Sequence, residues 1–126
     1  RDVVIAALLH DIIEDSETTA EEIEELFGKK ISKLVVSCTF DKTIDDETEM
    51  YKKNFEKAAK TSKEALAIRA ADLLDNSNYY HLVKDKQLYR RLLNKLDFFL
   101  VVAKKMIFGE KIYKALLKKR GELTNF

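Results

Sequence analysis

Histidine and carboxylate side chains gather in a short stretch of the sequence that is otherwise apolar. Residues 6–15 read A-A-L-L-H-D-I-I-E-D. Residues three and four apart share one face of an α-helix, so a helix here places His10 beside Glu14. On the same helix, Asp11 lies beside both Glu14 and Asp15. Because unpaired charges are costly to bury, a bound metal ion or a set of basic partners is needed if this face is buried.

The surrounding residues favour a buried helix. From Asp2 to Ile13 nearly every side chain is apolar, and a helix that is apolar on almost all sides is typical of a protein interior. We therefore expect one buried helix over about residues 2–15. The alternative is an ordinary helix end that emerges into solvent at Glu14, because charged residues are usually exposed.

A second stretch combines apolar and polar residues in the same way. Residues 65–74 read A-L-A-I-R-A-A-D-L-L, and Arg69, Asp72 and Asn76 follow at helical spacings. They share one helix face, where Arg69 and Asn76 could hold an anionic substrate. The alternative is an internal salt bridge between Arg69 and Asp72 on a surface stripe, since such pairs are common.

The two stretches together indicate a metal site. If His10 and Asp11 meet Asp72, one imidazole and two carboxylates converge, a donor set that suits manganese, iron or zinc better than calcium. Such an ion supplies a nucleophilic water at neutral pH and stabilises charge on a phosphoryl oxygen. Glu14 and Asp15, one turn further on, are placed to orient that water.

These motifs resemble those of the HD-domain phosphohydrolases. The likeness is strongest to the hydrolase domain of the RelA/SpoT type and its small stand-alone relatives, which remove the 3′-pyrophosphate from the alarmone ppGpp. It covers residues 1–80 and rests on three features of the sequence: His10-Asp11 followed by Glu14-Asp15, a threonine-capped acidic helix that ends at Phe27-Gly28, and A-x-R-A-A-D-L-L-D-N over residues 67–76.

The resemblance implies a role for each residue of the site. His10, Asp11 and Asp72 are implied to bind a divalent metal, usually manganese in this family, and Glu14 and Asp15 to activate or position the attacking water. The family's remaining metal-binding histidine, and basic residues for the guanine, precede the HD motif. We therefore expect residues 1–126 to be a single HD-type domain that lacks its N-terminal helices.

Substrate contacts are implied for three further residues. Asn76 matches the asparagine that contacts the nucleotide, Arg69 matches a basic position that is usually lysine, and Tyr79 stands where the family places a small ribose-contacting residue. The family's second motif usually reads A-D-R-L-H-N, whereas Leu73 and Asp75 here replace the arginine and the histidine.

Length and composition predict one all-α domain, an HD-domain-like bundle of about six to seven helices. The chain has 126 residues, no proline and three glycines, with many strong helix formers. Capping patterns place helix starts at Thr19, at Asp45 or Asp46, at Thr61 and at Asp85. Gly28 and Gly109 are expected to end helices, and the tail from Gly121 is expected to fray.

Composition also limits the partners of the protein. The single cysteine, Cys38, fits core packing in a reducing, cytoplasmic setting. The second part of the chain is basic, with 12 Lys/Arg against 4 Asp/Glu in residues 81–126. These residues alternate with apolar ones, as on the wet face of amphipathic helices, and no nucleic-acid motif accompanies them. We expect neither a nucleic-acid nor a membrane partner.

The sequence thus predicts a metal-dependent phosphohydrolase that acts on ppGpp or a related nucleotide. Two alternatives remain. One is a non-catalytic HD-like module that binds a nucleotide or a protein partner, which the altered Leu73, Asp75 and Tyr79 support. The other is an HD nucleotidase that cleaves simple monophosphates.

Overall fold

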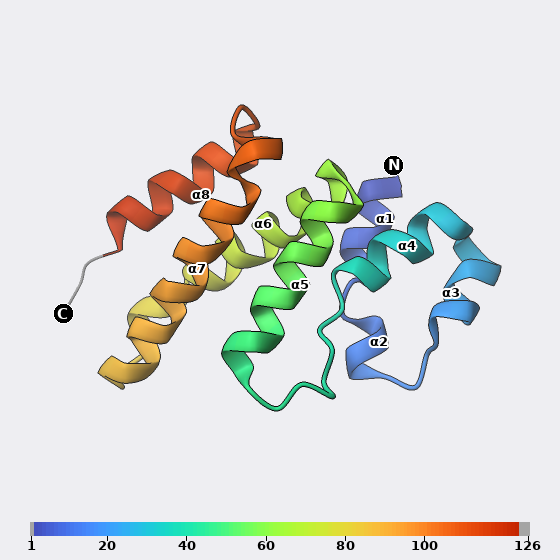
Figure 1. The fold of residues 1–126 in the computed structure, drawn as a ribbon, viewed down its shortest axis with the longest axis horizontal. Helices are drawn as coiled ribbons and strands as arrows, with labels where there is room; N and C mark the ends of the chain where they lie inside the picture. The colour runs from blue at the N-terminus through green and yellow to red at the C-terminus, as the bar shows by residue number, and fades with distance from the viewer. Residues whose placement is uncertain (1, 124–126) are drawn as a thin grey trace.

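The protein is a bundle of α-helices, as the sequence predicts (Figure 1). The computed structural model describes residues 2–123, apart from the side chains of residues 2 and 14. Seven helices in this range have eight residues or more. In chain order the elements are α1 (Asp2–Leu9), α2 (Ile12–Asp15), α3 (Ala20–Phe27), α4 (Lys29–Ser37), α5 (Glu47–Thr61), α6 (Lys63–Ser77), the 3-10 helix η1 (Tyr80–Leu82), α7 (Lys86–Ile107) and α8 (Lys111–Glu122).

Helix α6 occupies the centre of the bundle. It packs against α1, α4, α5, α7 and α8, with α1, α3 and α4 toward one end of the molecule and α7 and α8 toward the other (Figure 1). One main hydrophobic core takes buried side chains from all seven of the longer helices in the described range. The apolar stretch of residues 65–74 is buried as its pattern predicts, because α6 has neighbours on most of its sides.

Local capping explains where most helices begin. Thr19 and Glu22 form the predicted capping box at the start of α3, and the side chains of Asp46 and Asp85 cap α5 and α7. Gly28 adopts a φ of 93° between α3 and α4, a conformation that favours glycine. The side chains of Thr19, Asp46 and Asp85 thus satisfy amide groups that a helix start leaves unpaired.

Two predicted helix boundaries differ in the structure. Ser62, rather than Thr61, caps α6, and its Oγ accepts a hydrogen bond from the Ala65 amide at 3.2 Å. The extended backbone of Ser62 makes this possible, whereas Thr61 still belongs to α5. Helix α8 also continues past Gly121 to Glu122.

The prediction of one buried helix over residues 2–15 is wrong in two respects. First, the helix is not buried, since Ala6 is fully enclosed but Val4 and Leu8 are 62% and 80% exposed. The reason is that α1 lies at the edge of the bundle and packs mainly against α4 and α6. An apolar sequence therefore does not by itself surround a helix with neighbours.

Second, the helix is interrupted at the histidine. A turn at His10 and Asp11 separates α1 from α2. The ring nitrogen Nδ1 of His10 lies 2.6 Å from the carbonyl oxygen of Ala7, so the side chain competes for an acceptor that a continuous helix would use. Helical bonding resumes at once, because the amide of Asp15 donates to the carbonyl of Asp11 at 2.9 Å.

Among the described residues, no helix is both long enough and apolar enough to span a bilayer.

Candidate functional site

The structure brings together the three residues that the sequence predicts as metal ligands. His10 Nε2 lies 3.2 Å from Asp11 Oδ1 and 3.3 Å from Asp72 Oδ1. The two motifs are far apart in the sequence and meet because α1 packs on α6. On the other side of the ring, Nδ1 donates to the Ala7 carbonyl, which can only accept. This bond fixes the ring so that Nε2 faces both carboxylates.

Asp72 is held from its other side by a buried arginine. Its Oδ2 accepts a hydrogen bond of 2.9 Å from Arg69 Nη1, and Arg69 Nη2 donates to the carbonyl of Cys38. The guanidinium also lies 4.6 Å from the centre of the Phe40 ring. The predicted ion pair is therefore present, but it is buried rather than on a surface stripe, because Arg69 is only 3% exposed.

Charge holds this cluster together. The hydrogen bond with Asp72 raises the pKa of His10 to about 9, and partial burial opposes this rise. Burial of Asp72 raises its pKa, but the hydrogen bond from His10 and the charge of Arg69 outweigh burial and keep the pKa below its ordinary value. The pKa of His10 therefore lies above neutral pH, so its imidazolium form pairs with the carboxylates of Asp11 and Asp72.

The donor atoms suit a first-row divalent cation. Two atoms bound to one such ion at about 2.1 Å each stand roughly 3.0–3.4 Å apart, which matches the separations of 3.2 and 3.3 Å around Nε2. A ring held at Nδ1 by a carbonyl is also usual for metal-binding histidines. The three residues therefore fit a metal by their chemistry.

The cluster is nevertheless not assembled as a metal cage. In the part of the chain that the structure describes, no three His, Cys, Asp or Glu side chains stand arranged to hold a metal ion. Because a histidine nitrogen binds a metal only in its neutral form, His10 would have to lose its Nε2 proton to act as a ligand. The Asp11 side chain is 59% exposed, against 24% for Asp72, so Asp11 has the most freedom to move.

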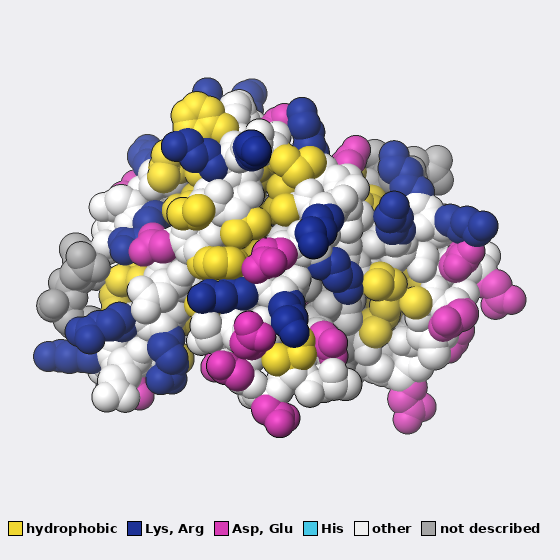
Figure 2. Space-filling view, in the orientation of Figure 1, with side chains coloured by type: hydrophobic (Ala, Val, Ile, Leu, Met, Phe, Trp, Pro, Cys, Tyr) yellow, Lys and Arg dark blue, Asp and Glu magenta, His cyan; other side chains and the backbone are white. Residues whose placement is uncertain are grey.

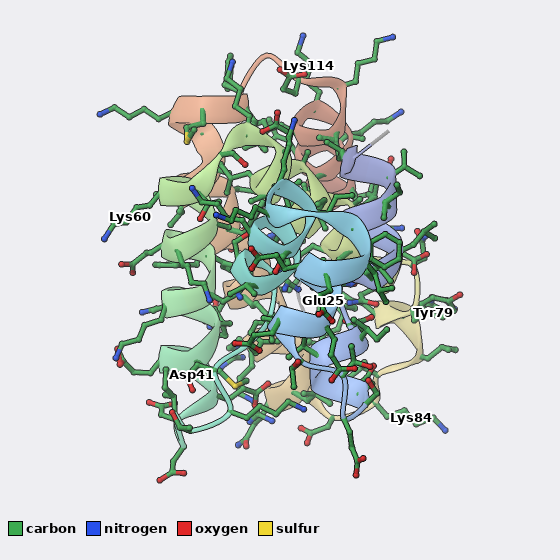
Figure 3. The ribbon with its side chains drawn as sticks, turned by 90° about the vertical axis from the view of Figure 1, so that its right-hand side faces the viewer. Glu25, Asp41, Lys60, Tyr79, Lys84 and Lys114 are labelled. Atoms are coloured by element: carbon green, nitrogen blue, oxygen red, sulfur yellow. The ribbon has the colours of Figure 1, made fainter. Side chains whose placement is uncertain are left out.

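The other predicted site residues lie around this cluster rather than in it. Asp15 ends α2 and is exposed, while the side chain of Glu14 lies outside the described residues. Asn76 is exposed one turn beyond Asp72 on α6. Tyr79 is 60% exposed and points away from the bundle (Figure 3). Their catalytic and substrate-binding roles stay predictions.

Two positions of α6 depart from the motif of the resembling family, one in the core and one on the surface. Leu73, at the position where the resembling family has arginine, is 2% exposed and belongs to the main core. Asp75, at the histidine position, is exposed on α6. With both replacements in place, Asp72 still pairs with His10 and Arg69.

Three residues near Asp72 escaped the sequence analysis. Burial, and then the charge of Asp72, raises the pKa of Tyr80 to about 12. The charge of Lys95 helps to lower the pKa of Asp72, and its Nζ lies 5.2 Å from the centre of the Phe40 ring. In the sequence, Phe40 stands at the start of a polar turn, and Lys95 has the spacing of a residue on a solvent-exposed helix face. Only tertiary packing brings them to α6, so no spacing in the sequence signals them.

The fold and the cluster define a class of protein, an all-helical domain in which a His-Asp pair meets an aspartate from a central helix. The HD domain family model matches residues 1–94. The chain therefore belongs to the HD domain family, and membership of this family of hydrolases implies a divalent metal.

Known relatives agree with this assignment. The chain is 43% identical over 74 residues to the guanosine-3′,5′-bis(diphosphate) 3′-pyrophosphohydrolase MESH1 of Drosophila melanogaster, covering 59% of this chain and 41% of that protein. It is 38% identical over 78 residues to the guanosine-3′,5′-bis(diphosphate) 3′-pyrophosphohydrolase of Aquifex aeolicus, covering 60% and 11%. The chain thus spans about two fifths of the fly protein.

A solved structure has the same fold. It is described as a metazoan ortholog of SpoT that hydrolyses ppGpp, and it is 26% identical to this chain with a TM-score of 0.83. The match covers 96% of this chain and 68% of the other. The likeness therefore extends beyond residues 1–94 to the helices at the C-terminal end.

Proposed function

We propose that this domain hydrolyses ppGpp or a related nucleotide and removes its 3′-pyrophosphate. The observation that carries the proposal is the meeting of His10, Asp11 and Asp72 in a chain whose relatives are named as hydrolases of this compound. We further propose that residues 1–126 act as one domain in the cytoplasm, for which the buried free thiol of Cys38 is suited.

The proposed metal is manganese, held by His10 Nε2 and by the carboxylates of Asp11 and Asp72. When bound, such an ion lowers the pKa of water and stabilises negative charge on a phosphoryl oxygen. The protein supplies the orientation. The Ala7 carbonyl keeps the His10 proton on Nδ1, and Arg69 keeps the carboxylate of Asp72 in place. The sequence predicts Arg69 as a substrate contact, but because it is only 3% exposed we propose that it acts through Asp72 as a positioning residue.

The reaction needs a base and contacts to the nucleotide. Glu14 and Asp15, just beyond the His-Asp pair, are proposed to orient the water and accept its proton. The water oxygen bonds to the phosphorus next to the ribose, the bond from that phosphorus to the 3′ oxygen breaks, and the 3′ oxygen takes up a proton. The products are GDP and pyrophosphate. Asn76, exposed near the end of α6, and Tyr79, exposed just beyond that helix, are proposed to contact the nucleotide.

A direct assay tests this proposal. Purified protein is incubated with ppGpp and manganese, and GDP and pyrophosphate are quantified by chromatography. We expect turnover that chelation abolishes and that Asp72→Asn lowers by about a thousandfold, since removing one transition-state contact costs on the order of 10²–10³. Asp75→Asn, an exposed carboxylate three residues away on α6, is the matched control and should retain activity. No turnover by protein that binds manganese would refute the proposal.

A non-catalytic nucleotide-binding module is the second candidate. Two observations favour it: no metal cage is assembled among the described residues, and Leu73 places an apolar side chain where the resembling family has arginine. Thermal shifts separate the two candidates, because a ligand of the folded state raises the melting temperature. Stabilisation by ppGpp in the presence of EDTA, without turnover when manganese is restored, would favour the module.

A further inference from the structure

A hollow lies between α4 and α5, apart from the His-Asp cluster. Its volume is about 470 Å³, within the usual range for small-molecule sites. None of the cluster residues lines it. The lining residues are Glu24, Lys29, Ser32, Lys33, Val36, Ser37, Lys57 and Thr61.

Three lysines give this hollow its charge. Lys29 and Lys33 stand one turn apart on α4, and Lys57 faces them from α5. Within the described residues none of the three forms an ion pair, and Glu24 is the one carboxylate in the lining. Figure 2 shows dark blue side chains over α4 and the adjoining part of α5, while acidic side chains gather over α3. This excess of positive charge is local to the hollow, because residues 1–80 as a whole are acidic, with 11 Lys/Arg against 18 Asp/Glu.

The hydroxyl groups that line the hollow already donate their hydrogens within the protein. Ser32 Oγ donates to the Ala20 carbonyl at 3.0 Å, and Ser37 Oγ to the Leu34 carbonyl at 2.7 Å. Thr61 Oγ1 likewise donates to a carbonyl of its own helix at 2.8 Å. Each hydroxyl has one hydrogen, so the oxygens of Ser32 and Thr61 can still accept hydrogen bonds from a ligand, whereas Ser37 is only 2% exposed.

The hollow is therefore lined by two kinds of group, cationic hydrogen-bond donors and oxygen acceptors. The lysine ammonium groups can bind anionic oxygens, and Glu24 with the hydroxyl oxygens of Ser32 and Thr61 can receive N–H or O–H groups. We propose that the hollow is a binding site for a phosphorylated small molecule that carries free hydroxyl groups, such as a sugar phosphate or nucleoside phosphate. A bare anion uses only the lysines, so it binds more weakly.

Calorimetry with the whole chain in EDTA tests this site, because the proposed catalytic metal is then absent. The probes are ribose 5-phosphate and inorganic phosphate. The test variant is Lys33→Gln with Lys57→Gln, and the matched control is Lys84→Gln with Lys114→Gln, two lysines at opposite ends of the molecule (Figure 3). Circular dichroism checks that both variants are folded.

We expect ribose 5-phosphate to bind more tightly than inorganic phosphate. The hollow variant should lose at least about tenfold in affinity, because each lost charge-assisted hydrogen bond contributes roughly that much, and the control should bind as the wild type does. Equal losses in both variants, equal affinity for both probes, or no millimolar binding of the sugar phosphate would each overturn the proposal. Asp72→Asn should leave this binding unchanged, which keeps the result separate from the proposed hydrolase activity.

Discussion

The two halves of the candidate site differ in how firmly the fold holds them. Asp72 lies on α6, which packs against α1, α4, α5, α7 and α8, and Arg69 fixes its carboxylate. His10 and Asp11 lie in a turn beyond the edge helix α1, of whose described side chains Ala6 is the one that is fully buried. The difference indicates that Asp72 is held firmly, and that any rearrangement on metal binding falls mainly to the exposed carboxylate of Asp11.

The largest expected effect is on the free energy of unfolding, when one leucine of α6 and one of α1 are each replaced by alanine. Leu66 on α6 is 0% exposed and Leu8 on α1 is 80% exposed. Leu66→Ala should lower the free energy of unfolding by about 2–5 kcal/mol, whereas Leu8→Ala should change it by less than about 0.5 kcal/mol. Urea denaturation measures both values. Similar losses from the two changes would show that α1 is as deeply packed as α6.

A smaller effect on the free energy of unfolding is expected when a charged residue is replaced in either half of the candidate site. Arg69→Met removes a partner of Asp72 and leaves the Cys38 carbonyl without its donor, so we expect a loss of about 2 kcal/mol in unfolding free energy. Asp11→Asn changes an exposed side chain and should cost less than about 0.5 kcal/mol. The comparison would fail if Asp11→Asn destabilised the protein as much as Arg69→Met.

The pH dependence of the metal-free protein should report the contact between the two halves. The pKa of His10 is raised from 6.5 to about 9 in the folded state, so its charged form stabilises the fold. This stabilisation is complete below pH 6.5 and is lost as the pH rises through 9. Denaturation in EDTA at a series of pH values, with His10→Gln as reference, measures it. A difference between wild type and His10→Gln that stays constant across this range would contradict the contact.

Much of the fold follows from local signals in the sequence. Thr19, Asp46 and Asp85 cap helices where the sequence places them, because caps depend on neighbouring residues. The sequence raises the meeting of the two motifs as the condition for a metal site, and in the structure His10, Asp11 and Asp72 do meet.

Other features depend on long-range packing and could not be predicted in this way. Arg69 bonds to the carbonyl of Cys38, which lies 31 residues away in the sequence, and no periodicity links such a pair. The exposure of Leu8 depends on which helices surround α1. The turn at His10 arises from a side-chain bond that competes with the helix backbone.

The central claim is that His10, Asp11 and Asp72 form one metal site across the two halves. Titration of the purified protein with manganese, followed by electron paramagnetic resonance at pH 8, tests it most directly. We predict one ion bound per chain, loss of this binding in both Asp11→Asn and Asp72→Asn, and an affinity lowered by about 10–100-fold in Arg69→Met. Manganese binding by Asp72→Asn that equals that of the wild type would contradict the claim.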